Sequence, residues 1–261
     1  MNVAVCVKQI PDPAEPGALD PNDYTLIRNG KLILDDSDSF GVEMALQLVE
    51  ASGGGDVVLI SMAPNNETSG LRTALAMGAA SAVLISDDAL HGSDALGTAK
   101  VLAAAIRTVH PLPDLVLAAT EATDGYTGTT PVQLAELLGW PSITFAKQVE
   151  VADGTVKVQR QTETGYDEVT SPLPAVVTVT AGVVEPRYPS FKGIMAARSK
   201  PVAEHTVASL GLDASEVGTV GARQQIVSVE AAEARSAGEI VVDEGDAHER
   251  IVAFLEQIKV L

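Results

Sequence analysis

The residues best suited to chemistry lie in one short stretch, residues 120–130 (TEATDGYTGTT), which we call the threonine-rich loop. The loop contains hydroxyl donors and glycines that permit close backbone approach. The donors are Thr123, Thr127, Thr129 and Thr130, and the glycines are Gly125 and Gly128. Residues 115–119 predict a buried strand before the loop, and helical apolar spacing begins at Thr130, the expected N-cap before Pro131. Two interpretations of the loop stay open. It is a phosphate cradle, since a helix N-terminus favours an anion, or it is an ordinary strand-to-helix connection.

No other motif predicts a reaction centre. The loop matches neither G-x-G-x-x-G nor G-x-x-x-x-G-K-[ST], the two common nucleotide-binding fingerprints. The four histidines lie far apart in the sequence, and no Ser-His-Asp or Cys-His arrangement stands out. Asp35, Asp36 and Asp38 resemble an acidic metal cluster, but helix capping and the helix dipole explain them more simply. We therefore expect no catalytic residue and no metal site.

A second stretch, residues 183–200 (VVEPRYPSFKGIMAARSK), is irregular at its start and is called the docking segment below. Its bulky apolar side chains and its basic side chains are Tyr188, Phe191, Ile194, Met195, Arg187, Lys192, Arg198 and Lys200. Apolar groups beside positive charge suit a surface that binds a partner. The alternative is a loop that covers the core of this protein itself.

The elements that position these stretches alternate between strands and helices. Apolar runs predict strands at residues 1–7, 56–62, 82–86 and 115–119, and helical spacing lies between them at residues 35–51, 68–77 and 97–110. This alternation predicts an α/β fold, a mostly parallel sheet with helices on both faces. The loops after Val7, Met62, Ser86 and Ala119 should then share the edge where such sheets bind ligands.

Other segments depart from this rhythm. Asn29-Gly30 and Asp153-Gly154 each stand between alternating runs and predict hairpins, and residues 175–180 predict another buried strand. The region from residue 207 contains short apolar runs at 225–229 and 239–242 and an expected helix at 247–259. We expect an α/β domain over residues 1–206 and a C-terminal extension over residues 207–261.

Composition limits the classes of partner. The chain has 261 residues, 46% of them hydrophobic, and a formal net charge of -18. This charge argues against nucleic acid and anionic membrane surfaces, which need a basic face. The single cysteine, Cys6, lies in a strand pattern and predicts a buried structural thiol. No apolar run reaches 18 residues and no secretion signal precedes the first strand, so we expect a cytoplasmic location.

Three segments together resemble the β subunit of electron-transfer flavoprotein. They are VCVKQIPDP at the amino terminus, LRTALAMGAASAVLI with the later DLVLAAT and LAELLGWPSITFAKQVEV, and VTAGVVEPRYPSFKGIMAARSKP. The resemblance implies an α/β fold of the adenine-nucleotide hydrolase-like, Rossmann-like type with an added hairpin. It implies a heterodimer whose α subunit holds most of a redox FAD and contacts the C-terminal extension. It also implies an electron carrier, not an enzyme, that connects flavin dehydrogenases such as acyl-CoA dehydrogenases with a quinone oxidoreductase.

The resemblance further implies that this subunit holds a structural AMP. The residues carried over to the nucleotide site are Cys6, Asp35, Asp36, Ser37, Asp38, Met62, Ala119, Thr120, Glu121, Ala122, Thr123, Asp124, Gly125, Tyr126, Thr127, Gly128, Thr129 and Thr130. Those carried over to partner docking are Glu185, Pro186, Arg187, Tyr188, Phe191, Ile194 and Met195. Phe191 stands where the family commonly has leucine, and a ring can fill a similar apolar pocket.

Departures from the family pattern leave the nucleotide open. Asp35-Asp36 replaces an asparagine-proline pair of some relatives, and the threonine-rich loop lacks the glutamine-rich middle of several others. Asp124-Gly125 and Thr127 are also similar to a branch of the family that binds a second FAD in place of AMP and bifurcates electrons. A stand-alone nucleotide-binding protein of the stress-response type is a further alternative, although it needs neither the docking segment nor the long tail.

Overall fold

The computed structural model describes residues 1–15, 17–230, 238, 240, 242–243 and 245–261. The chain divides into two units, Met1–Ile226 and Val227–Leu261, and each is described by itself. None of the described helices is both long enough and apolar enough to cross a membrane.

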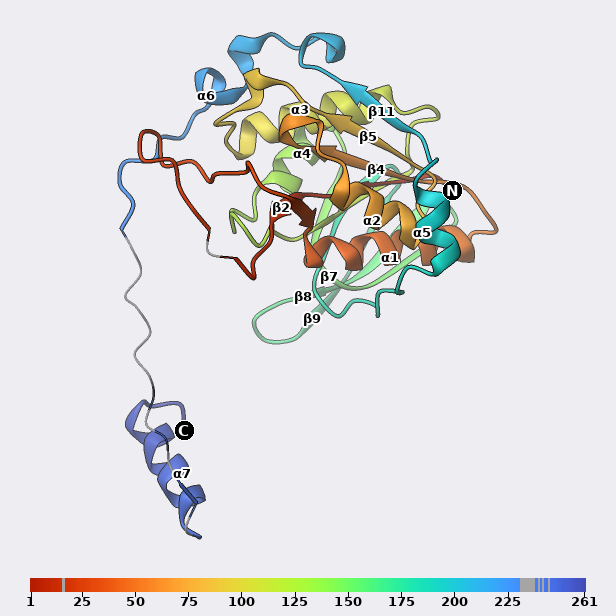
Figure 1. Cartoon of the computed structure of the whole chain (residues 1–261). Helices are drawn as coiled ribbons and strands as arrows, with labels where there is room; N and C mark the ends of the chain where they lie inside the picture. Colours follow the sequence, from red (N-terminus) through yellow and green to blue (C-terminus); the bar gives the residue numbers. More distant parts are fainter. Residues whose placement is uncertain (16, 231–237, 239, 241, 244) are drawn as a thin grey trace. The chain divides into compact units, whose positions relative to one another are not determined.

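The first unit is built on one large sheet, shown in Figure 1. Its nine strands among the described residues have the order β11-β5-β4-β1-β6-β10-β7-β8-β9. Each strand from β11 to β7 in this order is parallel to its neighbour. The pairs β7-β8 and β8-β9 are antiparallel. The strands of the sheet are β1 (Val3–Cys6), β4 (Val57–Met62), β5 (Ser81–Ile85), β6 (Leu115–Ala119), β7 (Ser142–Ala152), β8 (Thr155–Gln161), β9 (Tyr166–Pro172), β10 (Ala175–Val179) and β11 (Val202–His205).

Helices cover both faces of this sheet. They are α1 (Asp36–Ala51), α2 (Ser69–Met77), α3 (Ala95–Thr108), α4 (Thr130–Leu138), α5 (Phe191–Ala197) and the short α6 (Gly218–Gly221). Side chains of α1 and α2 form one core cluster with alternate residues of β1, among them Val3 and Val5. Side chains of α3 and α4 form a second cluster with Ala4 of the same strand. The predicted α/β fold is confirmed, because successive residues of a strand point to opposite faces and both faces are buried.

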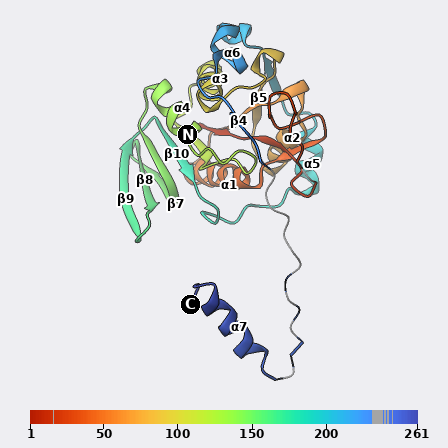
Figure 2. The same ribbon diagram turned by 90° about the vertical axis from the view of Figure 1, so that its left-hand side faces the viewer.

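The hairpin predicted at Asp153-Gly154 is confirmed. Asp153 and Gly154 have φ values of 51° and 72°, which suit a two-residue turn between β7 and β8. The strand β9, which the sequence analysis did not predict, extends this ribbon at one end of the sheet (Figure 2). β11, also unpredicted, pairs with β5 at the opposite end.

The hairpin predicted at Asn29-Gly30 is wrong. The strand β3 (Leu32–Leu34) pairs antiparallel with β2 (Gln9–Pro11) in a separate two-stranded sheet. Ile10 and Leu32 are both buried in this pairing, so apolar burial between distant segments prevails over the local turn signal. Pro11 is tolerated because β2 belongs to a two-stranded sheet, in which every strand is an edge strand.

The first unit continues beyond residue 206, where the sequence analysis placed the start of the extension. Residues 207–226 belong to the compact unit, with Val207 and Val217 buried in the core cluster of α3 and α4. The second unit contains α7 (Ala247–Gln257), which confirms the helix predicted over residues 247–259 to within two residues. Residues 239 and 241 of the apolar run expected at 239–242 lie outside the described residues.

Candidate functional site

The carboxyl ends of four neighbouring parallel strands, β5, β4, β1 and β6, lie at one edge of the large sheet. The loops after Val7, Met62, Ser86 and Ala119 therefore start from this edge, as the alternation of strands and helices predicted. The threonine-rich loop follows β6. It is also hydrogen-bonded to β10, the neighbour of β6 in the sheet, because the Thr120 N–H donates to the Val179 carbonyl at 3.2 Å. One edge of the sheet thus carries every predicted nucleotide-site residue.

Asp35 joins the start of α1 to the threonine-rich loop. Its side chain is fully buried, and Oδ1 accepts from the N–H and the hydroxyl of Ser37 at 3.0 and 2.7 Å. Oδ2 accepts from the N–H and the hydroxyl of Thr123 at 2.7 and 3.0 Å. Helix capping is expected of this acidic cluster, with Asp36, Ser37, Asp38 or Ser39 as the cap. The structure places the cap one residue earlier, at Asp35, and the same carboxylate also fixes the loop. Asp35 is therefore a positioning residue with both oxygens occupied.

Asp124 is held between two basic side chains. Lys8 Nζ lies 2.6 Å from Oδ1, and Arg28 Nη2 contacts Oδ2. Burial alone would raise the pKa of Asp124, but the charges and hydrogen bonds of Lys8 and Arg28 hold it below its usual range. These bonds fix the position of the loop at Asp124. Two cations share one carboxylate, so the group of three side chains carries a net positive charge. Sequence reasoning did not assign Lys8 and Arg28 to the site, although Lys8 belongs to the quoted VCVKQIPDP segment.

Asp38 lies in the first turn of α1 and Cys6 is the last residue of β1, where it is partly buried and not fully buried as predicted. Asp38 is buried, and its Oδ2 accepts from the Lys8 backbone N–H at 2.6 Å. Burial, reinforced by the charge of Asp35, raises the pKa of Asp38 to about 8. Burial, followed by the charge of Asp38, raises the pKa of the Cys6 thiol to about 12. Cys6 is thus a thiol without nucleophilic character, and it packs against the core cluster of α3 and α4.

The end of the threonine-rich loop leaves donors open. The residue before α4 is Thr129, and Thr130 is the first helical residue, so the N-cap predicted at Thr130 is wrong by one position. Gly128 adopts φ 62°, which turns the chain into the helix. Among the described residues, no acceptor pairs with the backbone N–H groups of residues 127–130 or with the hydroxyls of Thr127, Thr129 and Thr130. Open donors at a helix N-terminus fit a phosphate group.

The remaining predicted residues are spread along the same edge. Ser37 Oγ, whose proton is donated to Asp35 Oδ1 at 2.7 Å, also lies 3.4 Å from the Glu121 carbonyl oxygen, which brings the start of α1 close to the loop. Tyr126 has φ 50° and is 65% exposed, so its ring is available to a ligand or a partner. The others that complete the edge are Asp36, which is exposed, Met62 and Ala119, which end β4 and β6, and Ala122 and Gly125, which lie within the loop.

The docking segment is irregular at its start, as predicted, and continues into the helix α5, which the sequence did not predict. Ser190 caps α5 by accepting from the Gly193 N–H at 3.0 Å. Tyr188 and Phe191 are 93% and 82% exposed, and Ile194 and Met195 are about half exposed. Glu185 is exposed and Pro186 is half-buried. The arrangement gives an apolar surface on a short helix.

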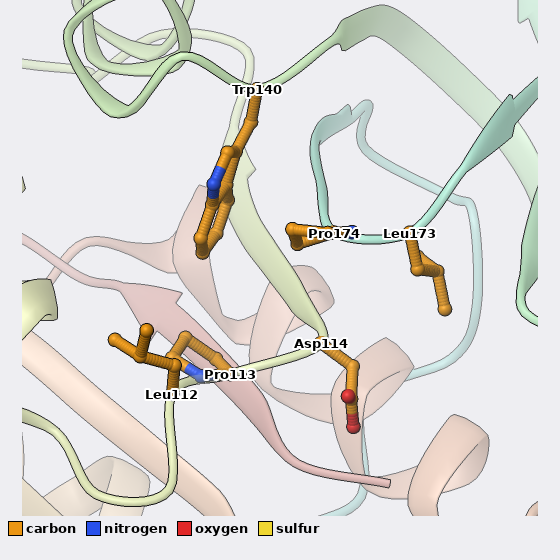
Figure 3. Close-up of a pocket in the computed structure, with 6 residues that line it drawn as sticks. All are labelled: Leu112, Pro113, Asp114, Trp140, Leu173 and Pro174. Carbon is orange, nitrogen blue, oxygen red and sulfur yellow. The ribbon is translucent and has the colours of Figure 1, made fainter.

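A separate hollow lies away from these residues. It has a volume of about 320 Å³ and is lined by Leu112, Pro113, Asp114, Trp140, Leu173 and Pro174 (Figure 3). These residues stand at the start of β6, β7 and β10, which is the amino end of those strands and thus the opposite edge of the sheet. Asp114 is also bonded to the chain start, since its Oδ2 accepts from the Asn2 N–H at 2.8 Å.

Comparison with known proteins finds relatives that match the chain over its whole length. A family model described as electron transfer flavoprotein domain matches residues 23–210. A protein of Mycobacterium leprae named electron transfer flavoprotein subunit beta is 39% identical over 265 residues, which cover 100% of this chain and 99% of the relative. A protein of the same name from Mycobacterium tuberculosis is 38% identical over the same shares. The caffeyl-CoA reductase-Etf complex subunit CarD of Acetobacterium woodii is 35% identical over 92% of each chain.

Proposed function

The chain belongs to the electron transfer flavoprotein family, and from this membership we propose that it is the β subunit of a heterodimeric electron carrier. The observation that supports this role most strongly is similarity over the full chain to relatives named subunit beta. The partner is an α subunit that holds most of the redox FAD. The heterodimer takes electrons from flavin dehydrogenases, such as the acyl-CoA dehydrogenases of fatty acid oxidation, and passes them towards a quinone oxidoreductase. We place it in the cytoplasm.

We propose that the threonine-rich loop holds an AMP. The support is the set of open N–H groups and hydroxyls at residues 127–130, which suits a phosphate, and the presence of Lys8 and Arg28 in the same loop region, where both pair with Asp124. When bound, AMP supplies no redox chemistry and stabilises the fold by binding only the folded state. Asp35 holds Thr123 in place, and Cys6 and Met62 contribute apolar surface. None of these residues acts as a general acid, a base or a nucleophile.

The second candidate is a bifurcating carrier with a second FAD at the same loop. Its support is the likeness of Asp124-Gly125 and Thr127 to that branch, together with two cations that also suit the larger charge of a pyrophosphate. In that case this subunit contains a redox centre of its own. A stand-alone stress-type protein is disfavoured, since the family match runs through the docking segment.

We propose that the second unit contacts the α subunit. Within α7 and the residues that follow it, Ile251, Phe254, Ile258 and Leu261 are all about half exposed or more. An amphipathic helix that leaves such side chains exposed is suited to burial against a partner.

Docking of the dehydrogenase should depend on Phe191. Phe191→Ala in the intact heterodimer should raise the KM for the carrier in dehydrogenase-driven electron transfer about tenfold. The physical reason is the loss of an exposed apolar anchor at a small, transient interface. Stopped-flow or steady-state transfer measured against carrier concentration checks this.

The bound flavin and nucleotide should stay at the parental level, because Phe191 lies on α5 and outside the threonine-rich loop. Tyr166→Ala is the matched control, since Tyr166 is also an exposed aromatic residue, 58% accessible, but belongs to β9. Equal KM values for Phe191→Ala and the parent would refute the docking assignment.

A further inference from the structure

The start of the docking segment is fixed to α1 by an ion pair. Arg187 Nε and Nη2 donate to the two carboxylate oxygens of Glu43 at 2.7 and 3.0 Å, and the Arg187 backbone N–H donates to Glu43 Oε2 at 3.2 Å. The Glu43 side chain is only 4% exposed. Burial alone would raise the pKa of Glu43, but the hydrogen bonds from Arg187 and Gln47 lower it. The Arg187 side chain is 37% exposed, and its bidentate contact with a buried carboxylate fixes the orientation of both side chains.

A second arm of Arg187 reaches an exposed residue. Nη1 donates to Glu50 Oε1 at 2.9 Å, and the Glu50 side chain is 61% exposed. Exposed pairs of this kind contribute little, because water and salt screen them. Glu43 and Glu50 therefore offer a buried and an exposed partner on the same helix for the same guanidinium.

The end of the docking segment is fixed to α2 by two further cations. Arg72 Nη1 donates to the carbonyls of Ala197 and Lys200 at 2.8 and 2.9 Å, which closes the C-terminus of α5. Lys200 Nζ donates to the carbonyls of Leu75 and Ala79 at 2.9 and 2.6 Å, at the C-terminus of α2. Each helix end thus receives a positive charge from the other element.

Between these attachments α5 lies directly on α2, as Figure 1 shows. A Cβ added to Gly193 would come within 2.4 Å of the Ala76 carbonyl oxygen, so only glycine permits this approach. Ala197 of α5 is buried in the core cluster of α1 and α2. One side of α5 is therefore packed against the domain. The exposed residues of the helix include Phe191, Ile194 and Met195.

We propose that Glu43 and Arg72 are positioning residues for partner docking, which hold the docking segment in its binding conformation before the partner arrives. This inference rests on the proposed function, since it assumes that the segment binds a dehydrogenase. A segment held in this way loses little conformational freedom on binding, so a small apolar contact can suffice. Two of its four basic residues, Arg187 and Lys200, are used internally. Lys192 and Arg198 have no bond to another described side chain and stay available to an acidic partner surface.

The test compares Glu43→Gln with Glu50→Gln in the full heterodimer. Glu43→Gln keeps the shape of the side chain but removes the charge that orients Arg187. We expect the KM for the carrier to rise about tenfold, equivalent to about 1.4 kcal/mol, with kcat within about twofold of the parent. Glu50→Gln should leave both constants within about twofold.

Amide hydrogen exchange of residues 185–197 is the second readout. Glu43→Gln should speed exchange in this segment about tenfold, whereas exchange in β1 and β6 stays at the parental rate. If Glu43→Gln fails to assemble, Arg187→Lys replaces it, because lysine keeps the charge and loses the two-pronged contact. The same rise in KM and the same faster exchange are expected of that variant.

The outcomes separate the inference from the proposed function. A raised KM in Phe191→Ala with parental KM and exchange in Glu43→Gln would overturn the positioning role alone. Parental KM in both Phe191→Ala and Glu43→Gln would overturn docking through this segment. A fall in kcat with an unchanged KM in Glu43→Gln would also contradict positioning, since that pattern belongs to a step after binding.

Discussion

Asp35→Ala should release the bound nucleotide and lower the free energy of unfolding by about 3 kcal/mol. The carboxylate of Asp35 is fully buried and accepts four hydrogen bonds, two from Ser37 and two from Thr123. Its loss removes the N-cap of α1 and leaves the donors of Thr123 without their acceptor. The threonine-rich loop would then lose its tie to α1.

Urea unfolding and the nucleotide content of the purified heterodimer measure the two effects of Asp35→Ala. Asp36→Ala is the matched control for stability, because Asp36 is the next residue, is exposed, and belongs to the same acidic cluster. The control should change stability by less than about 0.5 kcal/mol. Parental stability together with parental nucleotide content in Asp35→Ala would refute the assigned role of Asp35.

Asp38→Asn should make the protein more stable at pH 8 and remove part of the pH dependence of its stability. The folded pKa of Asp38 is about 8, raised from an ordinary value of 3.8. Between these values the folded protein keeps a proton that the unfolded chain has released, so the free energy of unfolding falls as pH rises. The slope from this one group reaches about 1.4 kcal/mol per pH unit, and the loss is complete above about pH 8.

Asparagine cannot ionise, yet its side-chain oxygen can still accept from the Lys8 N–H, now 2.6 Å from Asp38 Oδ2. The ionisable groups around this position are Asp35, Cys6 and Lys8, and all three remain in the variant. Chemical denaturation at half-unit steps from pH 5 to pH 8 measures the slope. Asp36→Asn removes the same charge from the exposed neighbour and should keep the parental slope. Parallel curves for Asp38→Asn and the parent would show that Asp38 is ionised in the fold.

The features that the sequence predicted rest on local patterns. The strand at residues 115–119 is apolar throughout and is buried throughout, and the acidic cluster at the start of a helical pattern does cap α1, although through Asp35 and not through a later residue. The shared edge followed from alternation of strands and helices alone. Apolar side chains beside basic ones indicated the docking segment, and the resemblance supplied Phe191 as its anchor. The exposure of Phe191 is known only from the structure.

The features that could not be predicted from the sequence depend on residues far apart in the chain. Lys8 and Arg28 lie 116 and 96 residues from Asp124, and Arg187 lies 144 residues from Glu43. Residues 166–172 form the edge strand β9, whose charged and polar residues hide the usual strand signal. The pairing of β2 with β3 was missed because a local turn signal at Asn29-Gly30 pointed to another partner.

The nucleotides released from the intact heterodimer decide which ligand the threonine-rich loop holds. The chain would be co-expressed with its α partner, purified, denatured, and its ligands separated by chromatography and identified by mass. We expect equal amounts of FAD and AMP, one of each per heterodimer. Two FAD and no AMP would contradict the AMP assignment and make the threonine-rich loop a redox site, and neither nucleotide with no retained partner would contradict the proposed carrier role itself.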